Sequence, residues 1–280
     1  MVLEYLKELV SLNTENPPGN ERKAAEYVKD LLKHYGIESE LQIVEDNRAN
    51  LIAWIGPADG RTVILTGHLD VVPAGDGWQT DPFRLVCKDG IGYGRGVSDM
   101  KGGIASMISA LVQVKKSVTL SHTRVMLVLV CDEEIHGKGT RAFLEQYQLP
   151  EDSMVIIGEP TSMEIQIAHR GVTRFRLTAH GVQAHSAFPQ QGSNAIFAIG
   201  RLLAGVEEWH KRRQASSSPH LPPPTASSTM IRGGIKDNVI PAEASCIIDC
   251  RTIPGDRSEN LKEELCKILD EIPLPDGCSY

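Results

Sequence analysis

The chain has 280 residues, 41% of them hydrophobic and 23% charged, with a formal net charge of −7; this is the composition of a soluble globular protein of one large or two ordinary domains, and it argues against a nucleic-acid-binding surface. No apolar run reaches membrane-spanning length and the N-terminus lacks a secretory signal, so we expect a cytoplasmic protein without a membrane partner. Six cysteines without a CxxC pair favour reduced structural thiols over disulfides or a zinc finger.

The first half of the chain is predicted to alternate helices and strands. Apolar residues at helical spacing mark two helices, near residues 3–10 and 24–32, which are separated by the turn-rich NTENPPGNE. Shorter strand-like runs follow. Continuous apolar runs then predict strands of a sheet covered on both faces, at residues 62–70, 124–134 and 154–159.

The pattern of apolar and polar residues changes after residue 168. An alternating strand at 174–179 precedes a helix at 194–209, and the Pro- and Ser-rich segment 216–228 is predicted to be an irregular surface loop. Two further strands and a final helix follow, at residues 229–231, 244–251 and 258–272. This order describes a small α+β domain of the ferredoxin-like kind that lacks its last strand. We therefore predict domains at 1–168 and 169–280.

Ionisable side chains follow each of the three apolar runs. His68 with Asp70 ends the first run, Glu133 with Glu134 ends the second, and Glu159 ends the third. In open α/β sheets the ligand site lies beyond the carboxyl ends of the strands, so these groups are expected on one rim. For any single residue, a hydrogen-bonded histidine or a solvated acidic strand end remains an alternative.

The glycine-dense stretch GRGVSDMKGG places Asp99 just before a helix predicted at residues 100–114. Its glycines permit a close approach of the backbone to a bound group. An ordinary helix N-cap is the alternative for Asp99. One histidine and several carboxylates suit a divalent metal with mixed N and O ligands, zinc above all, and Asp70 is expected to orient the His68 imidazole.

Six motifs in order, TGHLDVVP, GRGVSDMKGG, DEEIHGKGT, GEPT, AHSAFPQQGSNAI and GG…NVIP…DCR, resemble the co-catalytic zinc amidohydrolases and exopeptidases, the family of acetylornithine deacetylase, succinyl-diaminopimelate desuccinylase, aminoacylase and the glutamate carboxypeptidases. The resemblance covers nearly the whole chain. It implies a mixed α/β sheet sandwiched by helices, with an inserted ferredoxin-like lid and dimerisation domain, and the cleavage of an N-acyl amino acid amide. A dipeptidase or carboxypeptidase of the same family, or a catalytically silent metal-binding dimerisation fragment, remains open.

The resemblance also implies roles for the rim residues. Asp99 would bridge two zinc ions, for which Co or Mn can substitute, with His68 and Glu159 on one ion and Glu134 on the other. Glu133 would be the general base for the water between the metals. A cis peptide bond is implied between Asp99 and Met100.

In the second domain, the resemblance matches three residues to substrate contacts. His185 would reach the active site of the partner subunit in a homodimer and stabilise the tetrahedral intermediate. Asn238 and Arg251 would hold the substrate carboxylate, for which the planar guanidinium is suited. A surface-loop histidine and a structural salt bridge are the alternatives for His185 and Arg251.

The chain departs from the family pattern at its C-terminal end. Family members continue past the position of Tyr280 to a last histidine ligand of the second zinc, and neither His136 nor His169 is a convincing substitute. We therefore expect a fairly complete first metal site, an incomplete second site and weak or absent activity in the chain as it stands.

Overall fold

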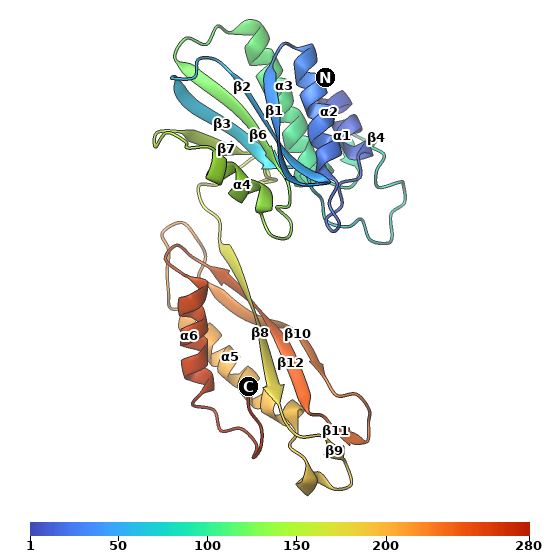
Figure 1. The fold of residues 1–280 in the computed structure, drawn as a ribbon, viewed down its shortest axis with the longest axis vertical. Coiled ribbons are helices and arrows are strands. Elements are labelled where there is room, and N and C mark those ends of the chain that lie inside the picture. The colour runs from blue at the N-terminus through green and yellow to red at the C-terminus, as the bar shows by residue number, and fades with distance from the viewer. The chain divides into compact units, whose positions relative to one another are not determined.

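The computed structural model describes residues 1–280. The chain divides into two compact units, Met1–Glu164 and Ile165–Tyr280 (Figure 1). The boundary predicted between residues 168 and 169 lies close to this division. None of the helices is both long and apolar enough to cross a bilayer.

A mixed five-stranded sheet forms the centre of the first unit, in the order β1-β2-β6-β3-β7. Strands β6, β3 and β7 are mutually parallel, whereas β1 and β2 run antiparallel to their neighbours. The carboxyl ends of the three parallel strands therefore lie at the same edge. The strands are β1 Glu38–Glu45, β2 Arg48–Ile55, β3 Arg61–His68, β6 Thr123–Val130 and β7 Met154–Ile157, and a separate hairpin joins β4 Val86–Lys88 to β5 Ile91–Tyr93.

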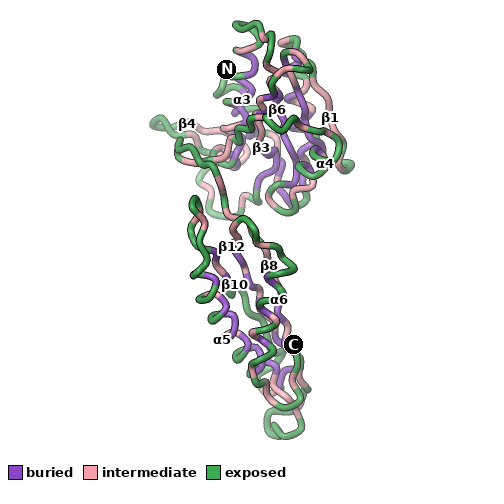
Figure 2. Tube along the Cα trace, turned by 90° about the vertical axis from the view of Figure 1, so that its left-hand side faces the viewer, coloured by how far each residue is buried: buried purple, intermediate pink, exposed green.

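Alternate residues of β2 and β6 pack on opposite faces of this sheet, as the strand period requires. Leu127 and Leu129 face a core that they share with three helices, whereas Met126 and Val128 face a smaller core with Phe143 of α4. In the first unit, Figure 2 shows buried stretches beside the labels of β3, β6 and α3. The helices are α1 Val2–Ser11, α2 Glu21–His34, α3 Gly102–Ser117 and α4 Lys138–Gln146.

Two predictions for this unit need correction. The run at 154–159 is not covered on both faces, because β7 is an edge strand and all four of its residues are exposed. The helix predicted from residue 100 begins at Gly102, because Asp99 and Met100 have non-helical backbone angles within the turn Val97–Lys101.

The second unit has a three-stranded antiparallel sheet in the order β10-β12-β8. Helices α5 and α6 pack on one face, where the small and apolar residues of the strands form a separate core. The elements are β8 Gly171–His180, β9 Ala184–His185, α5 Ala195–Arg213, β10 Thr225–Gly233, β11 Val239–Ile240, β12 Glu243–Thr252 and α6 Ser258–Leu269, with a short 3-10 turn at Pro189–Gln191. At the outer edge of β8, His180 pairs with Ser279.

The segment 216–228 is not irregular throughout, which corrects the prediction of a surface loop. Strand β10 begins at Thr225, which pairs with Arg251, and Ala226 is buried in the core. These pairings outweigh the turn-forming composition of the segment.

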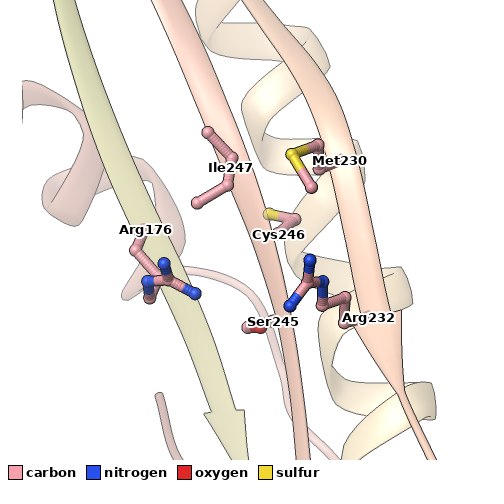
Figure 3. A pocket seen from close by; sticks show the side chains of 6 residues that line it. All are labelled: Arg176, Met230, Arg232, Ser245, Cys246 and Ile247. Carbon is pink, nitrogen blue, oxygen red and sulfur yellow. The ribbon is translucent and has the colours of Figure 1, made fainter. Parts of the chain in front are cut away.

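The other face of this sheet carries a hollow of about 100 Å³ (Figure 3). The side chains of Arg176 and Arg232 flank it, and Ser245, Cys246, Ile247 and Met230 complete its lining. Burial raises the pKa of the Cys246 thiol, and no carboxylate or imidazole lines the hollow. The groups suited to metal binding and acid–base chemistry therefore lie elsewhere, at the sheet edge of the first unit.

Candidate metal centre

His68 is the last residue of β3 and is 1% exposed. Its Nδ1 lies 2.9 Å from the main-chain carbonyl oxygen of Asp70. A carbonyl can only accept, so this contact assigns a proton to Nδ1, and Nε2 is the ring nitrogen that can bind a cation once it gives up its proton.

Three carboxylates from three other segments surround Nε2. Asp99 Oδ1 lies 2.9 Å from it, Glu159 Oε1 3.6 Å and Glu133 Oε2 3.9 Å. Asp99 belongs to the turn before α3, Glu133 follows β6 and Glu159 follows β7. The predicted convergence of the strand ends is present in the structure.

Glycines allow the turn that carries Asp99 to approach the sheet. Gly96 has φ +79°, and a Cβ there would lie 2.5 Å from Val71 Cγ1. A Cβ on Gly103 would lie 2.2 Å from the carbonyl oxygen of Gly158, the residue before Glu159. The peptide bond between Asp99 and Met100 is cis, as the family resemblance implied.

The electrostatics of the site show a concentration of negative charge. Burial opposes the charged form of His68, but hydrogen bonds to Asp70 and Asp99 together with the charge of Glu159 raise its pKa to about 11. The hydrogen bond from His68 lowers the pKa of Asp99. Burial raises the pKa of Glu159 and raises the pKa of Glu134 to about 6. The charges of neighbouring carboxylates add to both of these increases.

These donors fit a divalent cation. In each of two sets of three residues, the ligand atoms all lie within 4.8 Å of one another, and His68 belongs to both sets. One set adds Asp99 and Glu159, and the other adds Glu133 and Glu134. A buried imidazole with several carboxylates is a donor set for zinc and related ions, and a cation would offset the crowding of like charges. Asp99 and Glu134 fall in different sets, so the structure alone does not make Asp99 a bridge.

The carboxylate of Asp70 was predicted to orient the His68 imidazole, but its hydrogen bonds are with other groups. Its Oδ1 is 3.6 Å from His68 Nδ1, and the shorter contact of that ring nitrogen is to the Asp70 main chain. The carboxylate instead accepts hydrogen bonds from the main-chain N–H groups of Glu133 and Glu134, both at 3.1 Å, and from Asn16 Nδ2 at 2.9 Å. Asp70 therefore connects the imidazole to the main chain of the acidic pair.

Behind this pair lies a buried polar network that the sequence did not predict, made by Asn16, Glu21, Arg48 and Asp132. Asn16 lies in the NTENPPGNE segment, whose composition indicates only a turn. Arg48 begins a strand, and Asp132 lies within the run predicted as a strand. No local pattern distinguishes these residues, because their partners lie far away along the chain.

His185 and Asn238 lie close together in the second unit. His185 pairs with Val239 in the β9–β11 ladder, and the Ser186 N–H donates to the Asn238 carbonyl. His185 is exposed. The Oδ1 of Asn238 is buried without a hydrogen-bond partner.

Arg251 lies near the end of β12, a strand of the separate three-stranded sheet. It is eight residues beyond the start of β12, which at the rise of a strand is roughly 25 Å from that start, and the β9–β11 ladder precedes it. Its Nε donates to Asp249 Oδ1 at 2.9 Å, and Asp249 also pairs with Arg174. Within one chain the structure does not bring Arg251 and Asn238 to a common point, and it does form the salt bridge considered as the alternative.

Two family models match the chain. The model described as "Peptidase family M28" matches residues 50–159, and "Peptidase dimerisation domain" matches residues 167–277. A rim of one imidazole and several carboxylates in a peptidase domain, followed by a dimerisation domain, defines a hydrolase of the metallopeptidase class.

Relatives identify the family within this class. A probable succinyl-diaminopimelate desuccinylase of Staphylococcus epidermidis is 32% identical, covering 96% of this chain and 72% of the relative. The succinyl-diaminopimelate desuccinylase of Wolinella succinogenes is 33% identical, with coverages of 97% and 74%. The M20 family metallo-carboxypeptidase Sso-CP2 of Sulfolobus solfataricus has the same fold, with a TM-score of 0.74 at 17% identity over 98% of this chain and 78% of its own. The chain belongs to the M20 metallopeptidase family, and by family it is a metal-dependent hydrolase of amide bonds.

Proposed function

We propose that this protein hydrolyses the amide bond of an N-acyl amino acid, with N-succinyl-diaminopimelate as the first candidate substrate. The names of the relatives support this substrate class. The observation that carries the reaction type is the buried His68, whose Nε2 faces carboxylates from three other segments. The six unpaired cysteines support a reducing, cytoplasmic compartment.

Zinc is the metal that we propose, with cobalt or manganese as substitutes. His68, Asp99 and Glu159 would hold one ion, and Glu134 would contribute to a second. The grouping of His68 with Asp99 and Glu159 supports the first ion, and the position of Glu134 close to this group supports its contribution to a second ion. A bound divalent ion lowers the pKa of a water and polarises the substrate carbonyl.

Glu133 is the residue that we propose as the general base. Its carboxylate is half exposed and lies 3.9 Å from His68 Nε2, so a water at the rim is within its reach. The carboxylate would take one proton from the water whose oxygen bonds to the amide carbon. It would return that proton to the nitrogen as the C–N bond breaks, which leaves an amine and a carboxylic acid. The acid then loses the second proton of the water to become a carboxylate.

The second unit would supply the dimer contact and the remaining substrate contacts. The match to a dimerisation domain supports a homodimer. The exposure of His185 supports a donor that serves the partner's site, and we propose Asn238 and Arg251 as carboxylate-binding residues. Because these two lie far apart in one chain, they would act on different sites or from different subunits.

Release of free amine from N-succinyl-diaminopimelate, N-acetylornithine and dipeptides, measured with zinc or cobalt present, tests the proposal. We expect amine release to be fastest from the succinylated substrate. Glu133→Gln should lose amine release while retaining metal binding, and His68→Ala should lose both. Faster release from dipeptides would assign a dipeptidase instead, and equal rates for the wild type and Glu133→Gln would exclude catalysis by this route.

A further inference from the structure

Arg48 is buried at the start of β2, with its side chain 7% exposed, and it contacts five groups from four other segments. Its Nε lies 3.3 Å from Oε2 of Glu45, the last residue of β1. Its Nη1 lies 2.8 Å from Glu21 Oε1 and 3.0 Å from Asp132 Oδ1. Its Nη2 lies 2.8 Å from Asn16 Oδ1 and 2.7 Å from the Pro18 carbonyl. The planar guanidinium therefore sets the relative positions of these groups.

Asn16 extends this network to the candidate metal centre. It is 1% exposed, and its Nδ2 donates to Asp70 Oδ2 at 2.9 Å and to Asp132 Oδ1 at 3.0 Å. The same amide thus joins the carboxylate that contacts His68 to the residue that precedes the acidic pair. Its Oδ1 is engaged by Arg48, so the orientation of the amide is determined.

The network ends on the turn that carries Glu133 and Glu134. Asp132 has the unusual φ of +63°, and its N–H donates to Glu21 Oε1 at 3.2 Å. The next two N–H groups donate to Asp70. Three consecutive N–H groups of the turn therefore donate to two buried carboxylates, those of Glu21 and Asp70. Arg48 hydrogen-bonds the first of these carboxylates, and Asn16 hydrogen-bonds the second.

We propose that Arg48 and Asn16 are positioning residues, which fix the main chain of the Glu133–Glu134 pair relative to His68. The inference rests on the proposed function, because it assigns the pair to metal binding and base chemistry. None of the hydrogen bonds made by Arg48 or Asn16 reaches Asp99 or Glu159. The effect should therefore fall on the part of the centre that depends on Glu134.

Stability alone does not account for this arrangement. A buried ion-pair network gains little over well-packed apolar side chains, since desolvation offsets the attraction between the charges. Outer hydrogen-bond partners of metal ligands, in contrast, commonly change metal affinity 10- to 100-fold when they are replaced.

Cobalt titration of the whole chain tests the proposal, because the visible spectrum of bound Co²⁺ reports the number and arrangement of its ligands. Arg48→Lys and Asn16→Ser are the test variants, and neither changes the net charge. Lysine keeps the positive charge without the planar fork, and serine keeps a single hydroxyl donor. We expect the Co²⁺ binding that depends on Glu134 to weaken about 10- to 100-fold in each variant, with a changed visible spectrum.

Val28→Ala is the matched control, because Val28 is fully buried in α2 and its apolar side chain takes no part in the hydrogen bonds of Arg48 and Asn16. It should lower the urea midpoint while leaving cobalt affinity and spectrum unchanged. Circular dichroism identifies the variants that fold, and if Arg48→Lys does not fold, Asn16→Ser decides.

The outcomes are distinguishable. If the wild-type chain binds neither cobalt nor zinc, the proposed metal centre itself is wrong. A wild type that binds cobalt, with a folded Asn16→Ser variant of equal affinity and spectrum, would overturn the positioning role alone. An equal loss of affinity in Val28→Ala would assign the effect to general destabilisation and would also overturn it.

Discussion

At the scale of single residues, Gly103 is required where the first turn of α3 meets the end of β7. A Cβ at this position would lie 2.2 Å from the Gly158 carbonyl oxygen, so either the helix or the segment that carries Glu159 must move. We expect Gly103→Ala to lower the free energy of unfolding by about 1–3 kcal/mol, as overpacking does, and to weaken metal binding. Urea denaturation and zinc titration measure the two effects.

Gly200→Ala is the matched control for this substitution. Gly200 lies in α5, and no atom lies within 4 Å of the position that a Cβ would take there, so the methyl group meets open space. Alanine should stabilise the helix by up to about 1 kcal/mol. A Gly103→Ala variant as stable as the wild type would show that the contact with Gly158 relaxes without cost.

The buried Glu21 predicts a pH dependence of stability. Burial raises its pKa from 4.5 to about 6, against the opposing charge of Arg48. The folded chain therefore favours the protonated carboxyl, so this stabilisation is complete below pH 4.5 and is lost as the pH rises through 6. The Glu21→Gln variant cannot ionise at this position, so it should not lose this stability as the pH rises. Its free energy of unfolding relative to the wild type should rise by about 2 kcal/mol from about pH 4.5 to about pH 7.5.

Urea denaturation of both proteins across this pH range measures the difference. Glutamine keeps an oxygen that can accept from Arg48 and from the Asp132 N–H, so the comparison isolates the ionisation. A difference in unfolding free energy that stays constant with pH would contradict the raised pKa of Glu21.

At the scale of elements, the sequence predicted what depends on local periodicity. The apolar runs located β3, β6 and β7, and their common direction was sufficient to place His68, Glu133 and Glu159 at one edge. The network of Arg48 was not predictable, because Asn16 and Asp132 are 116 residues apart and meet only in the folded chain. For the same reason the sequence could not show that Asn238 lies before the start of β12 whereas Arg251 lies near its end.

Strand β6 should dominate the stability of the first unit, because it lies between β2 and β3 and is buried on both faces. Leu127 is fully buried in the larger core. We expect Leu127→Ala to cost about 2–5 kcal/mol, the sum of lost burial and the cavity that remains. The control Leu144→Ala, at a residue that is 57% exposed, should change the unfolding free energy by less than about 0.5 kcal/mol.

At the scale of the whole molecule, the chain contains cores that share no residue. The first unit holds two, one on each face of its sheet, and the second unit holds its own between the sheet and helices α5 and α6. A unit with its own core can unfold by itself. We therefore propose that the two domains unfold in separate transitions, which two buried thiols can report.

Cys131 belongs to the first unit and Cys250 to the second, and both are fully buried. Burial raises their pKa values to about 12 and about 11, so each thiol should react with an alkylating reagent only when its unit opens. Leu202→Ala, in the core of the second unit, should speed the labelling of Cys250 by about 30-fold or more, because the loss of at least about 2 kcal/mol raises the open population by that factor. Cys131 should keep its wild-type rate, and Leu111→Ala in the first unit should reverse the pattern. Mass spectrometry of timed samples follows each thiol, and equal acceleration of both by either variant would show that the chain opens as one cooperative unit.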